Sequence, residues 1–217
     1  MQLSARPAPS PPATTLTPGT TALELTRGRR GLLHVPHGTV TGLVVTLHGA
    51  GGQAQAALDL LRSEADRQGL VVLAPSSAGP SWAGLFSRRD PDTAALDVAL
   101  QSVLDRHPFD PGSVSVAGFS DGASYALSLG LANGDLFRRV VAFSPGFEIA
   151  GTRRGHPRFL VTHGVRDTVL PIERTSRRLV PALRREGYDV DYHEFDDGHV
   201  VPPRYVAEAA RWLVPAG

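Results

Sequence analysis

A serine between two glycines is the first group in this sequence that could do covalent chemistry. Residues Gly118-Phe119-Ser120-Asp121-Gly122 match the pattern Gly-x-Ser-x-Gly, which places a serine on a sharp strand-to-helix turn. The context fits, because an apolar, strand-like run precedes Ser120 and an apolar, helix-like run follows it. Such a helix directs its positive end at the site and favours a developing oxyanion. We therefore predict that Ser120 is a nucleophile, the alternative being an ordinary serine that caps the helix.

A serine hydroxyl reacts only when a base removes its proton, and a third group must orient that base. Among the eight histidines, His199 is the candidate base, because it lies between the last predicted strand and the last predicted helix. Asp167 follows another predicted strand and is the candidate orienting carboxylate. Asp196 and Asp197 are rivals near His199 in sequence, and we interpret both as solvated turn residues. The other histidines are interpreted as surface, packing or helix-end residues.

A glycine-rich segment, His48-Gly49-Ala50-Gly51-Gly52, follows the third predicted strand. Glycines let a backbone turn its amides toward a substrate oxygen, and each such donor contributes roughly 2.7–4 kcal/mol to transition-state binding. The predicted oxyanion-hole donors are the backbone amides of Ala50 and Asp121. The alternative is a phosphate-binding loop, which would need a Gly-Lys-Ser/Thr ending that this lysine-free sequence lacks.

The segment 76–92 is rich in proline, glycine and serine and is predicted to be a long functional loop. Apolar residues in it and in nearby turns are candidates for a substrate pocket, because pockets are mostly apolar. Each could instead be a core residue. The candidates are Trp82, Leu85, Phe86, Phe147, Leu170 and Val200.

Short apolar runs alternate with stretches that carry apolar residues at helical spacing. The predicted strands are residues 23–26, 31–35, 43–47, 70–74, 114–119, 140–143, 159–162 and 190–195, the first two forming a hairpin. The predicted helices are residues 53–68, 93–107, 120–133, 171–186 and 203–214. This alternation predicts a single α/β domain over residues 19–217, with a mostly parallel sheet covered by helices. In such sheets ligands bind beyond the carboxyl ends of the strands.

Composition excludes several classes of protein. With 217 residues, 22 basic and 21 acidic residues, the chain lacks the basic excess of a nucleic-acid binder. It has no cysteine, so thiolate metal sites and cysteine nucleophiles are excluded. No apolar run reaches the roughly 20 residues of a membrane-spanning helix. The proline-rich first 18 residues are predicted to be an extended, mobile tail.

Together these motifs resemble the α/β-hydrolase superfamily, in which the triad follows the chain order Ser, Asp, His. Within it, the chain resembles the small phospholipase/carboxylesterase group, with dienelactone-hydrolase-like and polyhydroxybutyrate-depolymerase-like esterases as close alternatives. The resemblance covers about residues 40–215 and includes the segments 163–171 and 198–199 besides the two glycine motifs. Two residues depart from the group: Asp121 stands where glutamine is frequent, and Ala123 replaces a second glycine.

The resemblance implies a compact hydrolase without a large lid, which needs no cofactor and acts on carboxylic esters or thioesters of small molecules. A metallohydrolase is disfavoured, because the sequence has no His-x-His or His-Glu-x-x-His cluster. It also implies a cytoplasmic enzyme and is compatible with a homodimer. We expect short to medium acyl chains, because no inserted cap domain is apparent. The alternatives are thioesterase, lysophospholipase-type or peptidase activity on the same triad, and a non-catalytic ligand-binding protein with this fold.

Overall fold

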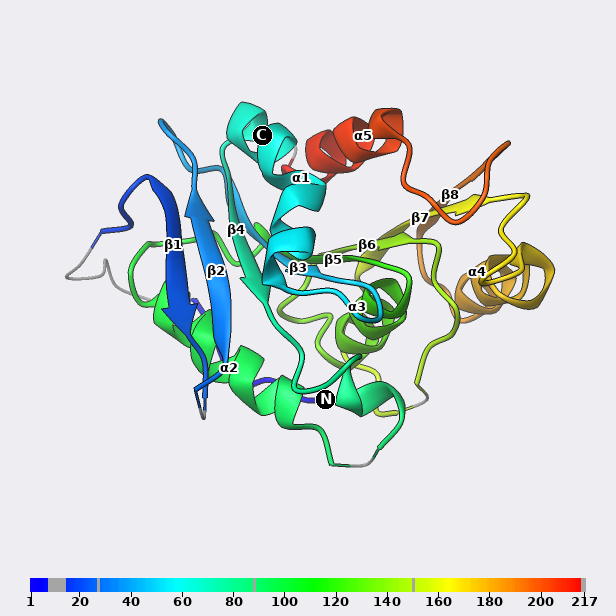
Figure 1. Cartoon of the computed structure of the whole chain (residues 1–217), viewed down its shortest axis with the longest axis horizontal. Helices are drawn as coiled ribbons and strands as arrows, with labels where there is room; N and C mark the ends of the chain where they lie inside the picture. Colours follow the sequence, from blue (N-terminus) through cyan, green and yellow to red (C-terminus); the bar gives the residue numbers. More distant parts are fainter. Residues whose placement is uncertain (8–14, 27, 88, 150, 216–217) are drawn as a thin grey trace.

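The computed structural model describes residues 1–7, 15–26, 28–87, 89–149 and 151–215. Within these ranges the apolar runs form one eight-stranded sheet with the order β1-β2-β4-β3-β5-β6-β7-β8 (Figure 1). The strands are β1 Gly19–Glu24, β2 Arg30–Val35, β3 Gly42–Leu47, β4 Leu70–Pro75, β5 Val114–Phe119, β6 Arg139–Phe143, β7 Arg158–Gly164 and β8 Val190–Phe195. The β1–β2 and β2–β4 pairs are antiparallel and the other pairs are parallel. The predicted hairpin and mostly parallel sheet are confirmed.

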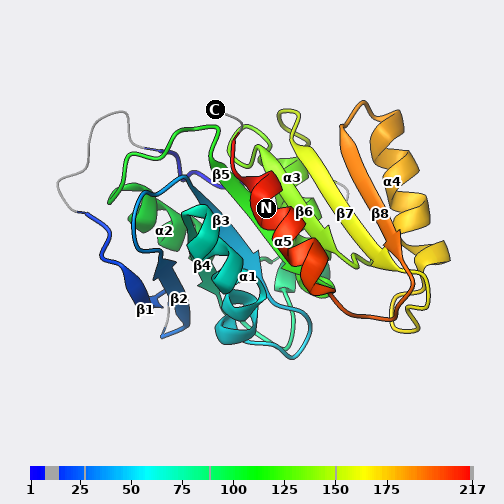
Figure 2. The ribbon, with the colours of Figure 1, turned by 90° about the horizontal axis from the view of Figure 1, so that it is seen from above.

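Helices cover both faces of the sheet, as the alternating pattern predicts. They are α1 Ala54–Gln68, α2 Pro91–Leu104, α3 Asp121–Ala132, α4 Ser176–Arg185 and α5 Pro203–Leu213, with short 3₁₀ turns at Ala83–Leu85 and Ile172–Arg174. Helices α1 and α5 lie on one face, whereas α2 and α3 lie on the other (Figure 2). Leu43 and Val45 of β3 join the core beneath α2 and α3, while Val44 between them joins the core beneath α1 and α5. Such alternation is expected of a strand buried on both faces.

One predicted helix differs from the structure. Instead of a continuous helix over residues 171–186, the chain makes a 3₁₀ turn and then α4. The two are separated at Thr175, whose backbone dihedrals, φ −122° and ψ −104°, are not helical. The Thr175 hydroxyl donates to the Pro171 carbonyl, a local bond that competes with helix formation.

The first seven residues belong to the folded domain, so the prediction of a tail over residues 1–18 is wrong for them. Leu3 and Ala5 are buried in the core beneath α2 and α3. The backbone amide of Leu3 donates to Asn133 Oδ1 at 2.8 Å, and that of Ala5 donates to Asp97 Oδ1 at 2.8 Å. These partners are about 90 or more residues away in sequence, beyond the reach of local composition. The rest of the predicted tail includes residues 8–14, which lie outside the described residues.

The three loops that carry the predicted triad residues leave the same edge of the sheet, because parallel strands end on the same side. They follow β5, β7 and β8, which lie in the continuous part β5-β6-β7-β8 of the sheet. None of the helices in the described part of the chain is long and apolar enough to cross a membrane.

Candidate active site

Ser120 occupies a strained turn between β5 and α3. Its backbone has φ 58° and ψ −122°, a left-handed conformation that is uncommon for residues other than glycine. A side chain at Gly118 would overlap the Gly122 backbone, and one at Gly122 would overlap the Leu47 carbonyl. The two glycines of the motif are therefore required, because at these positions the backbone of the turn packs closely against itself and against the end of β3. Strain of this kind persists only where the surrounding structure enforces it, which is typical of functional sites.

The structure brings Ser120, His199 and Asp167 together in one hydrogen-bonded chain. His199 Nε2 lies 2.9 Å from Ser120 Oγ, and His199 Nδ1 lies 2.6 Å from Asp167 Oδ2. Because a carboxylate only accepts, Nδ1 carries the proton and Nε2 accepts from the serine hydroxyl. The Phe119 ring packs against the imidazole with 4.7 Å between ring centroids. This geometry suits transfer of the serine proton to His199.

The Asp167 side chain is fully buried and has four polar partners, two backbone amides and two imidazoles. Its Oδ1 accepts from the amides of Val169 at 2.9 Å and Leu170 at 2.8 Å. Its Oδ2 faces His199 and, at 3.2 Å, His163 Nε2. Burial alone would raise the pKa of this carboxyl, but the Leu170 amide and His199 outweigh it and lower the pKa below 3.8. Asp167 is therefore ionised at neutral pH.

The rival carboxylates lie elsewhere. Asp196 is exposed and pairs with Arg166 at 2.7 Å, and Asp197 accepts from the amide of Gly198. Both therefore have the surroundings of solvated turn residues, as the sequence indicated.

The His48–Gly52 segment forms a tight turn beside Ser120. A side chain at Gly49 would come within 3.3 Å of Ser120 Cβ, and the amide of Gly52 donates to the Gly49 carbonyl at 3.0 Å. Ala50 lies in this turn, and Asp121 is the first residue of α3. In the described residues, neither of their amides is a donor in the hydrogen bonds of the turns and loops.

Both ring nitrogens of His48 make hydrogen-bond contacts that stabilise this turn. Its Nδ1 lies 2.8 Å from the Gly49 carbonyl, and its Nε2 accepts from the Ser77 amide at 3.1 Å. The ring packs on Trp82, with 4.7 Å between centroids. The Trp82 indole in turn donates to the His48 carbonyl at 2.8 Å. The histidine of the glycine-rich motif thus links that turn to the long loop 76–92.

Two of the six predicted pocket residues are core residues instead. Trp82 is 1% exposed and stacks on Tyr125, and Leu85 is 5% exposed. Neither presents appreciable surface to a substrate. Their burial follows from the packing of the loop against α3, which the loop's proline-rich composition does not reveal.

The remaining four candidates are at least partly accessible. Phe86 is 68% exposed and meets Phe147 edge to face, with 6.2 Å between centroids. Leu170 is half-buried and packs against Gly146, next to Phe147. Val200 is 43% exposed and follows His199 directly. Leu170, whose amide donates to Asp167, and Val200 can supply apolar surface beside the triad.

Buried polar residues that the sequence analysis did not select hold the loop 76–92 in place. Asp92 is buried, pairs with Arg29 at 2.5 Å, and accepts from the amides of Ala78 at 2.7 Å and Ala83 at 2.8 Å. The only local signal is the Asp90-Pro91 pair, which is typical of a helix start, and Asp90 indeed caps α2. Ser124 holds the loop after β6 in place in the same way, because its hydroxyl accepts a hydrogen bond from the amide of Gly146.

Two buried imidazoles make the stability of the fold depend on pH. Burial is the largest influence on both His48 and His163 and lowers the pKa of each below 6.5. Below pH 6.5 the unfolded chain therefore binds more protons than the folded one, and the free energy of unfolding decreases as pH falls from 6.5 toward the lowered pKa values. We expect the urea midpoint to be lower at pH 5.5 than at pH 7.5. His163→Gln should reduce that dependence, and an unchanged pH dependence would contradict the assignment.

In the part of the chain that the structure describes, no group of three or more His, Cys, Asp or Glu side chains could hold a metal ion.

No family model matches the chain. The chain is 30% identical over 159 residues to the feruloyl esterase C of Emericella nidulans, in a match that covers 67% of this chain and 57% of that protein. The chain thus matches little more than half the length of this curated relative.

Solved structures match nearly the whole chain. The carboxylesterase of Mesorhizobium loti has a TM-score of 0.69 and 23% identity, covering 88% of this chain and 98% of that one. The esterase PE8 has a TM-score of 0.67 and 23% identity over 91% of this chain and 98% of that one. The fluorophosphonate-binding serine hydrolase F of Staphylococcus aureus has a TM-score of 0.73 and 14% identity over 92% and 100%. The sheet, the serine turn and these likenesses show that the chain has the α/β-hydrolase fold.

Proposed function

We propose that this protein is a serine hydrolase that cleaves carboxylic esters of small molecules with short to medium acyl chains. The observation that carries the proposal is the chain of contacts from Ser120 Oγ through His199 to the buried Asp167, at 2.9 and 2.6 Å. The names of the similar proteins, esterases and carboxylesterases among them, support the same reaction class.

In the first step, Ser120 Oγ attacks the ester carbonyl while His199 Nε2 takes its proton. Asp167 holds the imidazole in place and stabilises the cation that forms. The amides of Ala50 and Asp121 bind the tetrahedral oxyanion, aided by the positive end of α3. When the ester C–O bond breaks, His199 returns the proton to the leaving alcohol, and the acyl group stays on Ser120.

Water then completes the cycle by the reverse roles. His199 removes a proton from water, whose oxygen attacks the acyl-enzyme carbonyl, and the same two amides bind the second oxyanion. Collapse of this intermediate expels Ser120, which regains its proton from His199. The products are one carboxylic acid and one alcohol, and no cofactor enters the balance.

Buried and exposed apolar side chains of the loops support the preference for shorter acyl chains. Trp82 and Leu85 fill the interior beside the glycine-rich turn. Apolar surface is left at the rim, at Phe86, Phe147 and Val200. A long acyl chain would therefore extend over half-exposed side chains and gain less from burial than in an enclosed tunnel.

The test is hydrolysis of p-nitrophenyl esters from acetate to palmitate, together with labelling by a fluorophosphonate. We expect turnover that declines toward palmitate, and labelling that Ser120→Ala abolishes. Methyl ferulate extends the series, because the curated relative is named a feruloyl esterase and Phe86 offers an exposed ring. Faster cleavage of a matched thioester would favour the thioesterase alternative. Absence of both turnover and labelling would favour a ligand-binding protein. A homodimer and a cytoplasmic location stay predictions of the family resemblance.

The Asp121 side chain should make the enzyme discriminate against anionic esters. Asp121 directly follows the nucleophile in sequence, and its carboxylate accepts a hydrogen bond from Ser81 Oγ at 2.6 Å. A negatively charged substrate a few ångströms from this carboxylate would be repelled by it. We expect Asp121→Asn to raise the ratio of kcat/KM for a p-nitrophenyl half-ester of glutarate over the butyrate ester by about 3- to 10-fold. Asp59→Asn, which removes an exposed carboxylate on α1, is the control for net charge. An equal change in both variants would contradict a local effect.

A further inference from the structure

His163 is a completely buried histidine outside the triad. It lies near the end of β7, four residues before Asp167, and its side chain has no exposed surface. Its Nε2 is 2.8 Å from the Leu170 carbonyl and 3.2 Å from Asp167 Oδ2. Its Nδ1 is 2.7 Å from Ser176 Oγ. The imidazole therefore spans from α4 to the carboxylate that orients His199.

The contacts determine which ring nitrogen carries the proton. A carbonyl oxygen and a carboxylate can only accept hydrogen bonds, so the Nε2 that faces both must be protonated. Burial lowers the pKa of His163, which keeps the ring neutral and leaves Nδ1 as an acceptor. Ser176 then donates its hydroxyl proton to Nδ1. Ser176 thus completes the hydrogen bonding of the tautomer in which the Nε2–H of His163 points at Leu170 and Asp167.

The same contacts hold the Asp167 carboxylate from two sides. The amide of Leu170 donates to Oδ1, while the carbonyl of Leu170 accepts from His163. His163 therefore fixes the turn that supplies a donor to one carboxylate oxygen and directly contacts the other. Rotation of a carboxylate about its last torsion is soft, so these donors determine the plane in which Oδ2 meets His199. A histidine with a purely structural role would need only its hydrogen bonds to the Leu170 carbonyl and to Ser176. The contact of His163 with Asp167 Oδ2 is additional to these two bonds.

We propose that His163, oriented by Ser176, is a positioning residue for Asp167 that keeps Oδ2 aligned with His199 during catalysis. The inference rests on the proposed ester hydrolysis. His163 does not lie among the reacting groups, so its effect must pass through the Asp167–His199 hydrogen bond. That bond becomes stronger when His199 is a cation, and its alignment should therefore affect kcat more than substrate binding.

The experiment compares His163→Leu, which removes the donor, with His163→Gln, whose amide keeps an N–H donor at a similar reach. With p-nitrophenyl butyrate, we expect His163→Leu to lower kcat by about 10- to 100-fold, in the range that misplacement of a catalytic group produces. KM should stay within about twofold, and His163→Gln should recover most of the lost kcat. Equal losses in the two variants, or a loss confined to KM, would overturn the proposal.

A spectroscopic signature separates this role from general destabilisation. The proton shared by His199 Nδ1 and Asp167 should give a far-downfield ¹H NMR resonance, which moves in His163→Leu and returns in His163→Gln. His34→Gln is the matched control, because His34 is also buried between a hydroxyl, Thr20, and a carboxylate, Asp66. It should leave both kcat and the resonance unchanged. An unmoved resonance in folded His163→Leu would overturn the proposal.

If His163→Leu does not fold, Ser176→Ala decides the question. It leaves the imidazole in place and removes only the hydroxyl that donates to Nδ1 and orients the ring. We expect kcat to fall about threefold or more at constant KM, and an unchanged kcat overturns the proposal. Failure of the proposed function is distinguishable, because the wild type itself would then neither hydrolyse esters nor react with a fluorophosphonate. An active wild type beside fully active His163 variants would overturn the positioning role alone.

Discussion

Ser120→Ala is expected to lower kcat for ester hydrolysis by about 10⁴- to 10⁶-fold, the scale seen when the nucleophile of a serine triad is removed. The physical reason is that alanine has no oxygen to form the acyl-enzyme, while His199 and the backbone amides of Ala50 and Asp121 remain. The remaining activity would come from binding and from oxyanion stabilisation. The measurement is kcat with p-nitrophenyl butyrate, together with the burst of p-nitrophenol that reports acyl-enzyme formation.

Ser102→Ala provides a matched control for the loss of a serine hydroxyl. Ser102 is half-buried on α2 and donates to the Ala99 carbonyl of its own helix. Its variant should keep the wild-type burst and kcat. If Ser120→Ala kept more than about a tenth of the wild-type kcat, the nucleophile would have to be another residue and the proposed mechanism would be wrong.

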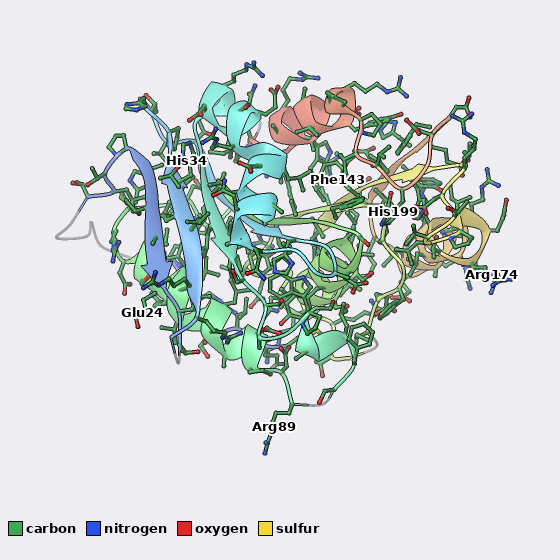
Figure 3. All side chains as sticks on the ribbon, viewed as in Figure 1. Glu24, His34, Arg89, Phe143, Arg174 and His199 are labelled. Atoms are coloured by element: carbon green, nitrogen blue, oxygen red, sulfur yellow. The ribbon has the colours of Figure 1, made fainter. Side chains whose placement is uncertain are left out.

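His199→Gln is expected to have an effect of similar size, because an amide cannot accept the serine proton at neutral pH. A second histidine with similar contacts, His34, provides a matched control for His199→Gln. His34 also bridges a hydroxyl and a carboxylate, with Thr20 Oγ1 2.8 Å from Nδ1 and Asp66 Oδ1 2.8 Å from Nε2. His34 lies on β2, well separated from His199 (Figure 3). Of these two histidines, His199 is the one whose hydroxyl partner, Ser120, lies on a strained turn.

The two variants should therefore differ by several orders of magnitude in kcat while losing similar polar contacts. His34→Gln should retain wild-type turnover and fluorophosphonate labelling, whereas His199→Gln should lose both. Similar kinetics in the two variants would show that the hydroxyl–imidazole–carboxylate arrangement at Ser120 has no special role. A loss in His34→Gln alone would point to the β1–β2 edge of the sheet.

Much of the fold could be predicted from the sequence, because the signals are local. The apolar run 43–47 and the helical spacing in 53–68 each lie within a short window, and both became regular elements, β3 and α1. Glycines at 118 and 122 marked the turn at Ser120, since only glycine tolerates the close approach found there. The boundaries were less predictable, as the break at Thr175 shows.

Features that depend on distant partners could not be predicted. The amide of Leu3 finds its acceptor in Asn133, and a proline-rich segment gives no sign of such a partner. Trp82 was selected as a pocket residue, yet it stacks on Tyr125 and its indole is bonded to the His48 carbonyl. Burial of a side chain depends on which elements pack over it, and composition alone does not specify that.

The sequence by itself determined the α/β alternation, the serine turn and the chain order Ser120, Asp167, His199, because each follows from short-range pattern or from the rule that parallel strands end on one edge. Only the tertiary structure decided that these three side chains meet within hydrogen-bonding distance and that His163 contacts the same carboxylate. Hydrogen bonds require alignment to a few tenths of an ångström. That precision arises from packing across 32 and 79 residues of sequence, after the sheet has set the order of its strands.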